Sequence, residues 1–522
     1  MPKWIFVTGG VLSGLGKGLV SASISKLLQE EERNIVPIKC DGYLNVDPGT
    51  MNPHEHGEVF VLEDGTEVDM DFGHYERFLG IECRGDWNLT SGRVFSDVIQ
   101  KERNGEYLGK TVQMVPHVTD HIKKKWGENA SQGDADVVMV EVGGTVGDME
   151  NQFYLEAVRQ MRNELPDQDT YLVHTTLVPY LDAVGEQKTK PTQHSVKELR
   201  ELGLEPDMVA GRSEDRLTEE SVEKISLFCD VDEKEVISDP NMDTVYRLPL
   251  VFQDQDAGSI ISESLGIQYS SGSLEDWRER TENLSSGPLA KIALCGKYTE
   301  MDDSYASIEE ALKHSAVEIG GSVEIQQVDT EEFDPEDLEG FDGVVIPGGF
   351  GSRGVQGKIE AIRHCRREGI PLLGICYGMQ LMSIEYARTV LDLDAASEEF
   401  SDDHEDSVIK EMKEQKNVEK MGGTMRLGSY KAEVSGRVES IYGSKEVEER
   451  HRHRYELNPE YEERLEAEGL RISGRNPESG LAEFIELEDH RFFIGTQAHP
   501  EFTSSFEDPN PLYLEFLNSC TE

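Results

Sequence analysis

A cysteine and a histidine–glutamate pair in the C-terminal half have the residue types and spacing of a thiol nucleophile with its base. Cys376 lies in the Gly-Ile-Cys-Tyr-Gly run at 374–378, where an apolar stretch enters a sharp turn before a helical pattern. The helix dipole favours a thiolate, and the backbone N–H of Tyr377 can stabilise an oxyanion. We expect His499 and Glu501 to lie on one face of an extended segment, so that Glu501 orients His499. This set predicts hydrolysis of an amide with release of ammonia.

A glycine-rich run near the N-terminus, residues 9–18, has the composition of a phosphate-binding loop. It follows an apolar strand pattern at 4–7 and opens a helical pattern. It is not a strict Walker A sequence, because Val11 replaces the first glycine and Gly18 replaces the usual serine or threonine. Its glycines still let backbone N–H groups face a phosphate, and Lys17 adds a positive charge at the helix N-terminus. The run predicts a nucleoside triphosphate site, with a glycine turn that binds no ligand as the alternative.

Carboxylates and lysines elsewhere in this half could complete such a site. Residues 137–141 read as a buried strand that ends in Glu141, which suits a magnesium ion beside a phosphate loop. Asp69 and Asp71 offer a further ligand, or are solvated loop acids. The segment 188–195 has two lysines with hydroxyl and amide donors on a proline-stiffened loop. It suits a triphosphate or is an ordinary surface loop.

The His-Arg-His-Arg run at 451–454 is a weak candidate for a zinc site or a nucleic-acid contact. It lacks a cysteine or carboxylate partner nearby in the sequence, and the chain is strongly acidic. An arginine that binds a carboxylate is the better interpretation.

Acidic residues outnumber basic ones by about two to one. The chain has 103 Asp and Glu against 51 Lys and Arg, for a net charge of −52 at pH 7. This balance argues against nucleic acid or an anionic membrane as partner. The acids are spread along the chain, which indicates an ordinary acidic surface or a cytoplasm of very high salt that screens self-repulsion.

The remaining composition points to a soluble cytoplasmic protein. We expect no N-terminal signal region, because a core-like strand begins near the first residues, and no apolar run approaches the roughly 18 residues of a membrane span. The seven cysteines include no CxxC pair, which fits reduced thiols better than disulfides or zinc.

Repeats of strand, glycine turn and helix predict parallel α/β sheets in both halves of the chain. Loops at the carboxyl ends of such strands are where ligands bind. Three apolar strands end in paired glycines, at 5–10, 137–144 and 344–349.

A change of composition marks the boundary between the halves. Between 270 and 288 the chain is rich in Ser, Glu, Arg and Gly, and a new apolar strand follows. We therefore predict two α/β domains, 1–266 and 290–522, with a linker at 267–289. The charged stretch 402–420 is expected to be an exposed insertion.

With these residues in view, the chain closely resembles the CTP synthase family over nearly its whole length. The resemblance is carried by long strings that are specific to that family, unlike the phosphate loop alone. They are residues 7–18, 45–51, 56–61, 73–78, 142–148, 188–196, 422–428 and 450–455.

The resemblance implies an N-terminal P-loop, Rossmann-like synthase domain and a C-terminal class I glutamine amidotransferase domain. In that family ATP phosphorylates the 4-oxygen of UTP, and ammonia from glutamine, passed internally, displaces the phosphate. Magnesium accompanies ATP, GTP activates the enzyme and CTP inhibits it, and the family members are homotetramers. A cobyrinic-acid-type amidase, which also joins a P-loop synthase to a glutaminase but activates carboxylates, is the alternative. The acidic composition adds a halophilic source to these expectations.

The resemblance also implies site residues, carried over by position. The expected catalytic triad is Cys376, His499 and Glu501. The expected ATP contacts are Gly14, Leu15, Gly16, Lys17, Gly18, Leu19, Asp71, Pro240, Asn241 and Met242. The expected UTP and CTP contacts are Ser13, Asp148, Met149, Glu150, Lys188, Thr189, Lys190, Pro191, Thr192, Gln193 and Lys224. The expected glutamine contacts are Gly349, Tyr377, Gly378, Met379, Gln380, Glu399 and Arg454, and the expected magnesium ligands are Asp71 and Glu141.

Overall fold

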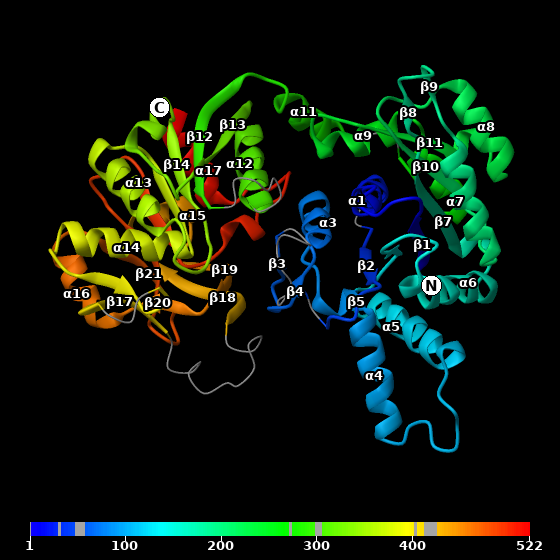
Figure 1. Ribbon diagram of the computed structural model, residues 1–522, viewed down its shortest axis with the longest axis horizontal. Coiled ribbons are helices and arrows are strands. Elements are labelled where there is room, and N and C mark those ends of the chain that lie inside the picture. Colours follow the sequence, from blue (N-terminus) through cyan, green and yellow to red (C-terminus); the bar gives the residue numbers. More distant parts are fainter. Residues whose placement is uncertain are drawn as a thin grey trace. The chain divides into compact units, whose positions relative to one another are not determined.

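The computed structural model describes residues 2–29, 33–46, 48, 58–270, 274–297, 305–400, 404–411 and 425–521. The chain divides into two compact units (Figure 1). The first unit contains Met1–Pro48 and His74–Glu279, and the second contains Gly49–Gly73 and Arg280–Glu522. Three of the strings that carry the family resemblance, 45–51, 56–61 and 422–428, fall partly outside the described residues.

The first unit is built on a seven-stranded sheet in the order β11-β10-β7-β1-β6-β2-β5. Every pairing in it is parallel, as the sequence predicted. β1 lies between β6 and β7, so the chain changes direction across the sheet at β1, the place where ligands bind in such folds. The strands are β1 (Lys3–Gly9), β2 (Ile35–Asp41), β5 (Asn88–Thr90), β6 (Val137–Val142), β7 (Thr170–Leu177), β10 (Met208–Ser213) and β11 (Val236–Pro240).

Helices cover this sheet because its central strands are apolar on both faces. All six residues of β6 are buried, the pattern of a parallel strand that is covered on both sides. The helices that lie within the unit are α1 (Lys17–Leu28), α4 (Ser91–Arg103), α5 (Thr119–Gln132), α6 (Gln152–Glu164), α7 (Lys190–Glu201), α8 (Glu219–Cys229), α9 (Leu248–Gln253) and α10 (Ala257–Leu265). Two further helices, α3 (Asp71–Leu79) and α11 (Glu275–Asn283), cross the divisions between the units, and the short strands β8 (Tyr180–Leu181) and β9 (Glu186–Gln187) form a hairpin.

The second unit has a nine-stranded sheet in the order β13-β12-β14-β15-β23-β22-β21-β18-β19. The pairings from β13 to β23 are parallel, and those from β23 to β19 are antiparallel, so the sheet continues past its parallel half as a mixed sheet. Its strands are β12 (Pro288–Gly296), β13 (Ser322–Asp329), β14 (Gly343–Ile346), β15 (Leu372–Ile375), β18 (Arg426–Val434), β19 (Glu446–His453), β21 (Arg471–Arg475), β22 (Ala482–Glu486) and β23 (Phe493–Thr496).

Two apolar cores lie against this sheet. One contains Met379 and Met382 of α14, and the other contains Phe516 of α17. The helices are α12 (Ala306–Ile319), α13 (Val355–Glu368), α14 (Tyr377–Thr389), α15 (Gly436–Tyr442), α16 (Pro459–Ala467) and α17 (Pro511–Thr521). The smaller strands are β3 (Phe60–Val61), β4 (Glu67–Val68), β16 (Ala395–Ser397), β17 (Asp406–Glu411) and β20 (Tyr455–Leu457).

The stretch 402–420, predicted to be an exposed insertion, lies mostly outside the described residues. Its described part contains β17, which pairs with β16 and β20 and buries Val408 and Ile409 completely. That part is therefore a half-buried strand and not an exposed insertion. None of the helices in the described part of the chain combines the length and apolar character that a membrane crossing requires.

Candidate active site

Cys376 occupies a strained turn between β15 and α14, as the nucleophile-elbow pattern predicted. Its backbone has φ 51° and ψ −100°, a conformation that costs a non-glycine residue free energy and persists only where the surroundings enforce it. Its N–H donates to the carbonyl of Thr496 over 2.7 Å. A Cβ added to Gly378 would lie 2.2 Å from the carbonyl oxygen of Ile346, so the helix approaches β14 too closely for a side chain. The turn therefore holds the thiol at the carboxyl ends of the parallel strands.

His499 and Glu501 form a buried pair beside the thiol. The predicted extended segment is wrong, because Pro500 turns the chain into a short 3₁₀ helix, Pro500–Phe502, directly after His499. The turn still brings His499 Nδ1 and Glu501 Oε1 to 2.7 Å, and Glu501 is 2% exposed. Burial by itself lowers the pKa of His499, but its interactions with Glu501 and Cys376 outweigh burial and raise the pKa to about 10. The imidazole Nε2 is buried and has no hydrogen-bond partner among the described residues, so the protonated ring is placed to give a proton to a leaving group and to take one back.

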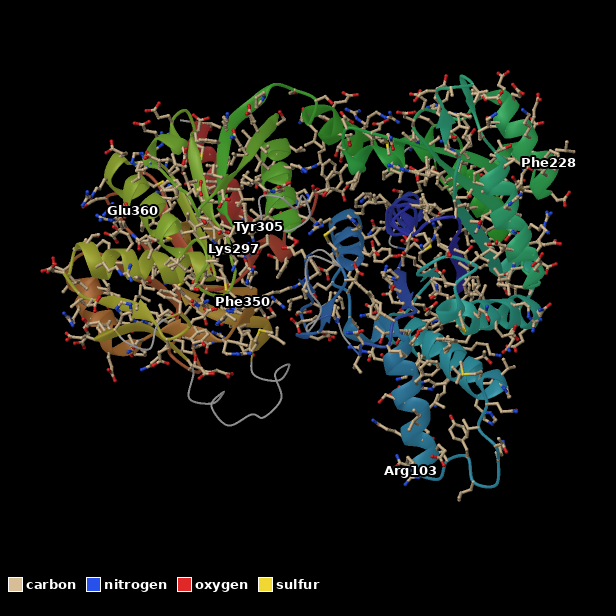
Figure 2. The ribbon with its side chains drawn as sticks, viewed as in Figure 1. Arg103, Phe228, Lys297, Tyr305, Phe350 and Glu360 are labelled. Atoms are coloured by element: carbon tan, nitrogen blue, oxygen red, sulfur yellow. The ribbon has the colours of Figure 1, made fainter. Side chains whose placement is uncertain are left out.

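A cavity of about 130 Å³ opens onto these residues. Its wall includes Tyr305 and Phe350, which lie near Lys297 in Figure 2. The backbone N–H of Lys297 donates to the Tyr305 hydroxyl over 3.2 Å, and its ammonium group donates to the carbonyl of Phe350. The complete lining is Glu58, Val59, Tyr305, Ile308, Gly348, Gly349, Phe350, Cys376, Arg452, His499, Glu501 and Phe502.

The structure brings most of the predicted glutamine contacts to the region of the thiol. Tyr377, Gly378, Met379 and Gln380 form the first turn of α14. The hydroxyl of Tyr377 donates to the carbonyl of Gly351 over 2.7 Å. This bond ties the loop after β14 to the elbow, so the tyrosine contributes its side chain as well as its backbone N–H.

Glu399 and Arg454 supply opposite charges at this edge. Burial raises the pKa of Glu399, and the N–H of Gly351 and the positive charges of Lys297 and Arg454 act against that rise. Gly351 N–H donates to Glu399 Oε1 over 2.7 Å. Arg454 follows β19, and its buried Nε has no hydrogen-bond partner among the described residues. These two side chains are suited to the amino and carboxylate groups of an amino acid.

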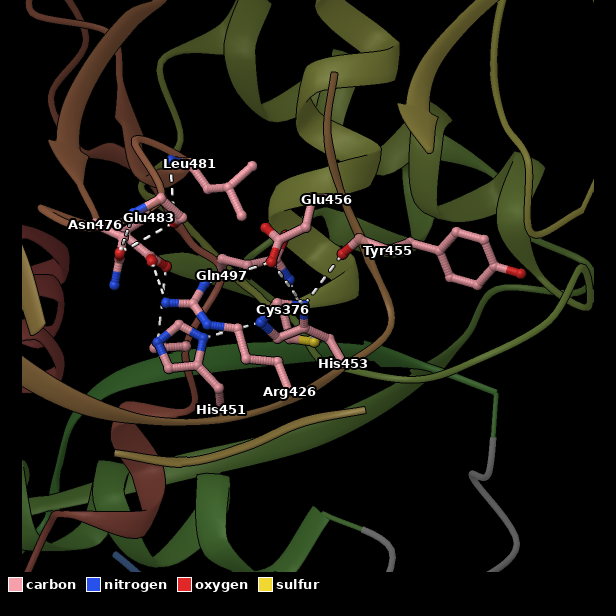
Figure 3. A network of polar contacts seen from close by, with 12 residues as sticks. Cys376, Arg426, His451, His453, Tyr455, Glu456, Asn476, Leu481, Glu483 and Gln497 are labelled. Atoms are coloured by element: carbon pink, nitrogen blue, oxygen red, sulfur yellow. Dashed lines mark hydrogen bonds and ion pairs between the residues drawn. The ribbon is translucent and has the colours of Figure 1, made fainter. Parts of the chain in front are cut away.

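A buried polar network lies next to Cys376 (Figure 3). Arg426 is paired with Glu456 over 3.4 Å and with Glu483 over 2.6 Å, and His451 Nδ1 lies 2.9 Å from His453 Nε2. Burial raises the pKa of Glu456 to about 8 and lowers the pKa values of both histidines, so the imidazoles are neutral. Among the described residues no group of three or more His, Cys, Asp or Glu is arranged to bind a metal. The histidines of this run are structural parts of the network.

The predicted phosphate loop connects β1 to α1. Gly16 has φ 84° and precedes the first residue of the helix, the left-handed conformation that glycine adopts at little cost. Gly14 also has a positive φ, and Gly18 and Leu19 form the first turn of α1 with Lys17. The Lys17 ammonium donates to the carbonyl of Gly144 over 2.8 Å, at the turn after β6. The loop therefore places its glycines and a buried lysine at one end of the parallel sheet.

A neutral histidine, which the sequence analysis did not select, joins the end of β1 to α7. His174 of β7 contacts the Thr8 hydroxyl through Nδ1 at 2.9 Å and the Ser195 hydroxyl through Nε2 at 2.6 Å. Burial, with a smaller contribution from the charge of Lys17, lowers the pKa of His174 to about 3. A Cβ on Gly10 would lie 1.5 Å from the Ser195 oxygen. A histidine inside a buried strand was the available signal, but its partners are far away in the sequence.

The segment 188–195 is not the loop that was predicted. Helix α7 begins at Lys190, and Pro191 lies in its first turn, where proline is tolerated because its missing N–H would have no helical partner. Thr189 precedes the helix, and Thr192 is buried with its hydroxyl on the carbonyl of Leu177. Lys190 is the first residue of the helix, and Lys188 lies two residues before it.

The other predicted nucleotide contacts lie on several elements of the first unit. Lys188 pairs with Glu186, Lys190 donates to Gln193 over 2.8 Å, and Lys224 of α8 pairs with Glu220 over 2.6 Å. Ser13 is exposed in the phosphate loop, Asp148 accepts from the N–H of Thr145, and Met149 and Glu150 follow it in an exposed turn. Pro240 ends β11 beside Ser213, and Asn241 and Met242 come directly after it.

The carboxylate of Glu141 lies in a buried polar cluster of the first unit. Its Oε1 lies 3.4 Å from the ammonium of Lys39, and its Oε2 accepts from the hydroxyl of Tyr75 over 2.7 Å. Asp41, which was not selected from the sequence, lies 3.6 Å from the same ammonium. Two carboxylates that meet at one cation are oxygen donors of the kind magnesium prefers. Asp71, the other predicted magnesium ligand, is the first residue of α3 and belongs to the second unit.

A strained cysteine elbow with a buried histidine–glutamate pair, joined in one chain to a parallel sheet with a phosphate loop, defines a nucleotide-dependent glutamine amidotransferase. A family model described as CTP synthase N-terminus matches residues 3–267, and one described as glutamine amidotransferase class-I matches residues 300–519. The chain belongs to the CTP synthase family.

Relatives match the chain from end to end. A CTP synthase from Archaeoglobus fulgidus is 49% identical over 526 residues, covering 99% of this chain and 98% of the relative. A CTP synthase from Halalkalibacterium halodurans is 47% identical over 527 residues, covering 99% of each chain. Among solved structures, the glutaminase domain of Trypanosoma brucei CTPS with bound acivicin is 38% identical and covers 44% of this chain and 93% of its own, with a TM-score of 0.42.

Proposed function

We propose that the chain converts UTP to CTP, using ATP to activate the uracil ring and ammonia released from L-glutamine to aminate it. The observation that carries the proposal is the strained Cys376 elbow beside the buried His499–Glu501 pair, in a chain that also has a phosphate loop. The family membership disfavours the cobyrinic-acid-type amidase, whose substrate is a carboxylate.

The glutaminase reaction follows from the groups around the thiol. With the proton of Cys376 already on Nε2 of His499, the thiolate attacks the side-chain amide carbon of glutamine, and the N–H of Tyr377 stabilises the resulting oxyanion. His499 then gives the proton to the leaving nitrogen, so that ammonia departs and a thioester remains. Water, deprotonated by His499, attacks the thioester and releases glutamate and the free thiol. Glu501 keeps the imidazole oriented and stabilises its charged form.

The synthase reaction needs a phosphate donor held at the loop before α1. Lys17 and the backbone N–H groups of that loop bind the ATP phosphates, and the lysines at the start of α7 bind the UTP triphosphate. The γ-phosphoryl group passes to the 4-oxygen of UTP and leaves ADP. Ammonia then attacks carbon 4, and phosphate departs with that oxygen to leave CTP. Glu141 and Asp71 are the residues that would hold magnesium, which would neutralise phosphate charge.

The proposal extends to regulation and surroundings. It includes activation by GTP, inhibition by CTP and a homotetramer, which are carried over from the family resemblance, and a cytoplasmic location, which rests on the composition of the chain. It also includes adaptation to high salt, which is supported by the net charge of −52.

Separating the nitrogen source from the phosphate chemistry tests the proposal. Cys376→Ala should abolish CTP formation from glutamine and leave formation from ammonium largely intact at a pH where free NH₃ is present. Lys17→Ala should lose CTP formation from both sources, because phosphorylation precedes amination. Absence of CTP formation by the wild-type chain from UTP, ATP and glutamine would refute the proposal. Retention of glutamine-dependent synthesis in Cys376→Ala would refute the role of the thiol.

A further inference from the structure

A second side chain besides the imidazole reaches the sulfur of the proposed nucleophile. Gln497 is completely buried, one residue after β23, and its Nε2 lies 3.7 Å from Cys376 Sγ. On another side the same sulfur lies 3.8 Å from the backbone carbonyl of Arg452. Figure 3 shows Gln497 and Cys376 among the residues of the buried polar network. The sulfur thus has a hydrogen-bond donor and a hydrogen-bond acceptor within reach.

The neighbours of Gln497 determine which end of its amide faces the sulfur. Gln380 donates from Nε2 to the backbone carbonyl of Tyr455 over 2.8 Å, and a carbonyl can only accept. The orientation of the Gln380 amide is therefore set, and its second N–H donates to Gln497 Oε1 over 3.2 Å. With its oxygen held there, Gln497 must direct its NH₂ group towards Cys376.

The two contacts of the sulfur suit different protonation states. A thiol can donate its proton to the carbonyl of Arg452, but a thiolate cannot, and it is repelled by the carbonyl oxygen. The N–H of Gln497 interacts more strongly with the thiolate than with the thiol, because hydrogen bonds to a charged partner are the stronger ones. The contact therefore strengthens at the moment when Cys376 loses its proton to His499.

We propose that Gln497 is a catalytic residue of the glutaminase reaction, donating an N–H to the Cys376 thiolate and stabilising it before attack on the amide. Gln380 acts through Gln497 as a positioning residue in this step, in addition to any contact with glutamine. The inference rests on the proposed glutaminase function and adds a stabilising group to it.

The test is the pH dependence of Cys376 alkylation in the full-length chain. Iodoacetamide modification of the Cys376 peptide is followed by mass spectrometry in wild type, Gln497→Met and Gln497→Leu, two uncharged variants that present no amide N–H to the sulfur. Losing a hydrogen bond to a charged group should move the midpoint of the alkylation profile up by about one to two pH units. Glutaminase kcat near neutral pH should fall about 10- to 100-fold by the same conversion, while KM for glutamine changes little. Gln356→Met, the same change at an exposed position of α13, should match wild type.

An unchanged alkylation midpoint in both Gln497 variants, with a higher KM for glutamine, would overturn the inference and leave Gln497 as a support for Gln380. Gln497→Leu is uncharged as well, so it gives the same test if Gln497→Met does not fold in thermal melting. Alkylation needs neither nucleotide nor glutamine. A wild-type chain that made no CTP would therefore refute the proposed function, while the alkylation profile would still decide the role of Gln497.

Discussion

Replacing Glu501 with glutamine tests whether a buried carboxylate keeps His499 protonated. Oε1 of Glu501 lies 2.7 Å from Nδ1 of His499, and the pKa of His499 stands at about 10. A hydrogen bond between charged partners contributes about 1.5 to 3 kcal/mol, and about 1.4 kcal/mol corresponds to one pKa unit. Glu501→Gln should therefore lower the pKa of His499 by about one to two units. The imidazolium that protonates the leaving ammonia would then lose its proton near pH 8 to 9, about one to two pH units lower than in wild type.

The assay is glutamate release from glutamine between about pH 6 and 10.5, a range that spans the ordinary and raised histidine values. In wild type the rate should fall as the pH rises through about 10, and in Glu501→Gln the same decline should occur at lower pH. Near pH 9.5 kcat should fall about tenfold, because most of the imidazolium is lost in the variant and kept in wild type, and near neutral pH the two rates should lie closer together. Ammonium-dependent CTP formation should be unchanged. Glu507→Gln, the same substitution at an exposed position six residues later, is the matched control.

The same pair predicts a pH dependence of stability with a defined sign. His499 has a folded-state pKa above its unfolded value of about 6.5, so its stabilising contribution is complete below about pH 6.5 and is lost as the pH rises through about 10. Urea unfolding should show the difference in stability between wild type and Glu501→Gln shrinking over that range. An alkaline limb and kcat that do not change in the variant would refute the reasoning, because the carboxylate would then not be what raises the pKa of His499.

Three further outcomes are expected. Asp71→Asn or Glu141→Gln should abolish CTP formation with either nitrogen source, and near-normal rates across a magnesium titration in both variants would contradict the magnesium assignment. Activity, measured by CTP formation, and assembly, measured by light scattering, should persist in molar KCl. Both should decline as salt is removed, because the repulsion between carboxylates is then no longer screened. Full activity in dilute buffer would contradict this expectation. His174→Leu leaves the hydroxyls of Thr8 and Ser195 without their shared partner, at a cost of about 1 to 3 kcal/mol per buried group. This substitution should lower the melting temperature and slow CTP formation from both nitrogen sources, while basal glutamine hydrolysis continues. An equal loss of CTP formation and glutamine hydrolysis would contradict a role of His174 that is local to the first unit.

Several parts of the site could be predicted from the sequence because their geometry is local. The turn at Cys376 follows from glycines on either side of the cysteine between a strand and a helix, and the loop before α1 follows from glycines that permit positive φ. Paired glycines at the ends of apolar strands indicated where β1, β6 and β14 end. In each case a short stretch of chain contains both the residue and the reason for its conformation.

Other features depended on partners that are distant in the sequence. Helix α7 begins at Lys190, where a loop was predicted, and a 3₁₀ helix begins at Pro500, where an extended segment was predicted. A proline in the first turn of a helix cannot be distinguished from a proline in a loop by the local sequence. The antiparallel half of the second sheet was not foreseen either, because the strand order is decided by long-range pairing.

The sequence by itself determined the classes of chemistry: a thiol with a histidine and a carboxylate, a phosphate loop, and a strongly acidic surface. Only the tertiary structure decided which side chains meet. It brought Gln497 to within 3.7 Å of Cys376 across 121 positions, and His174 to the hydroxyl of Thr8 across 166 positions. The physical reason is that a buried polar group must find a hydrogen-bond partner wherever the packed fold supplies one, and a local sequence pattern does not specify that partner.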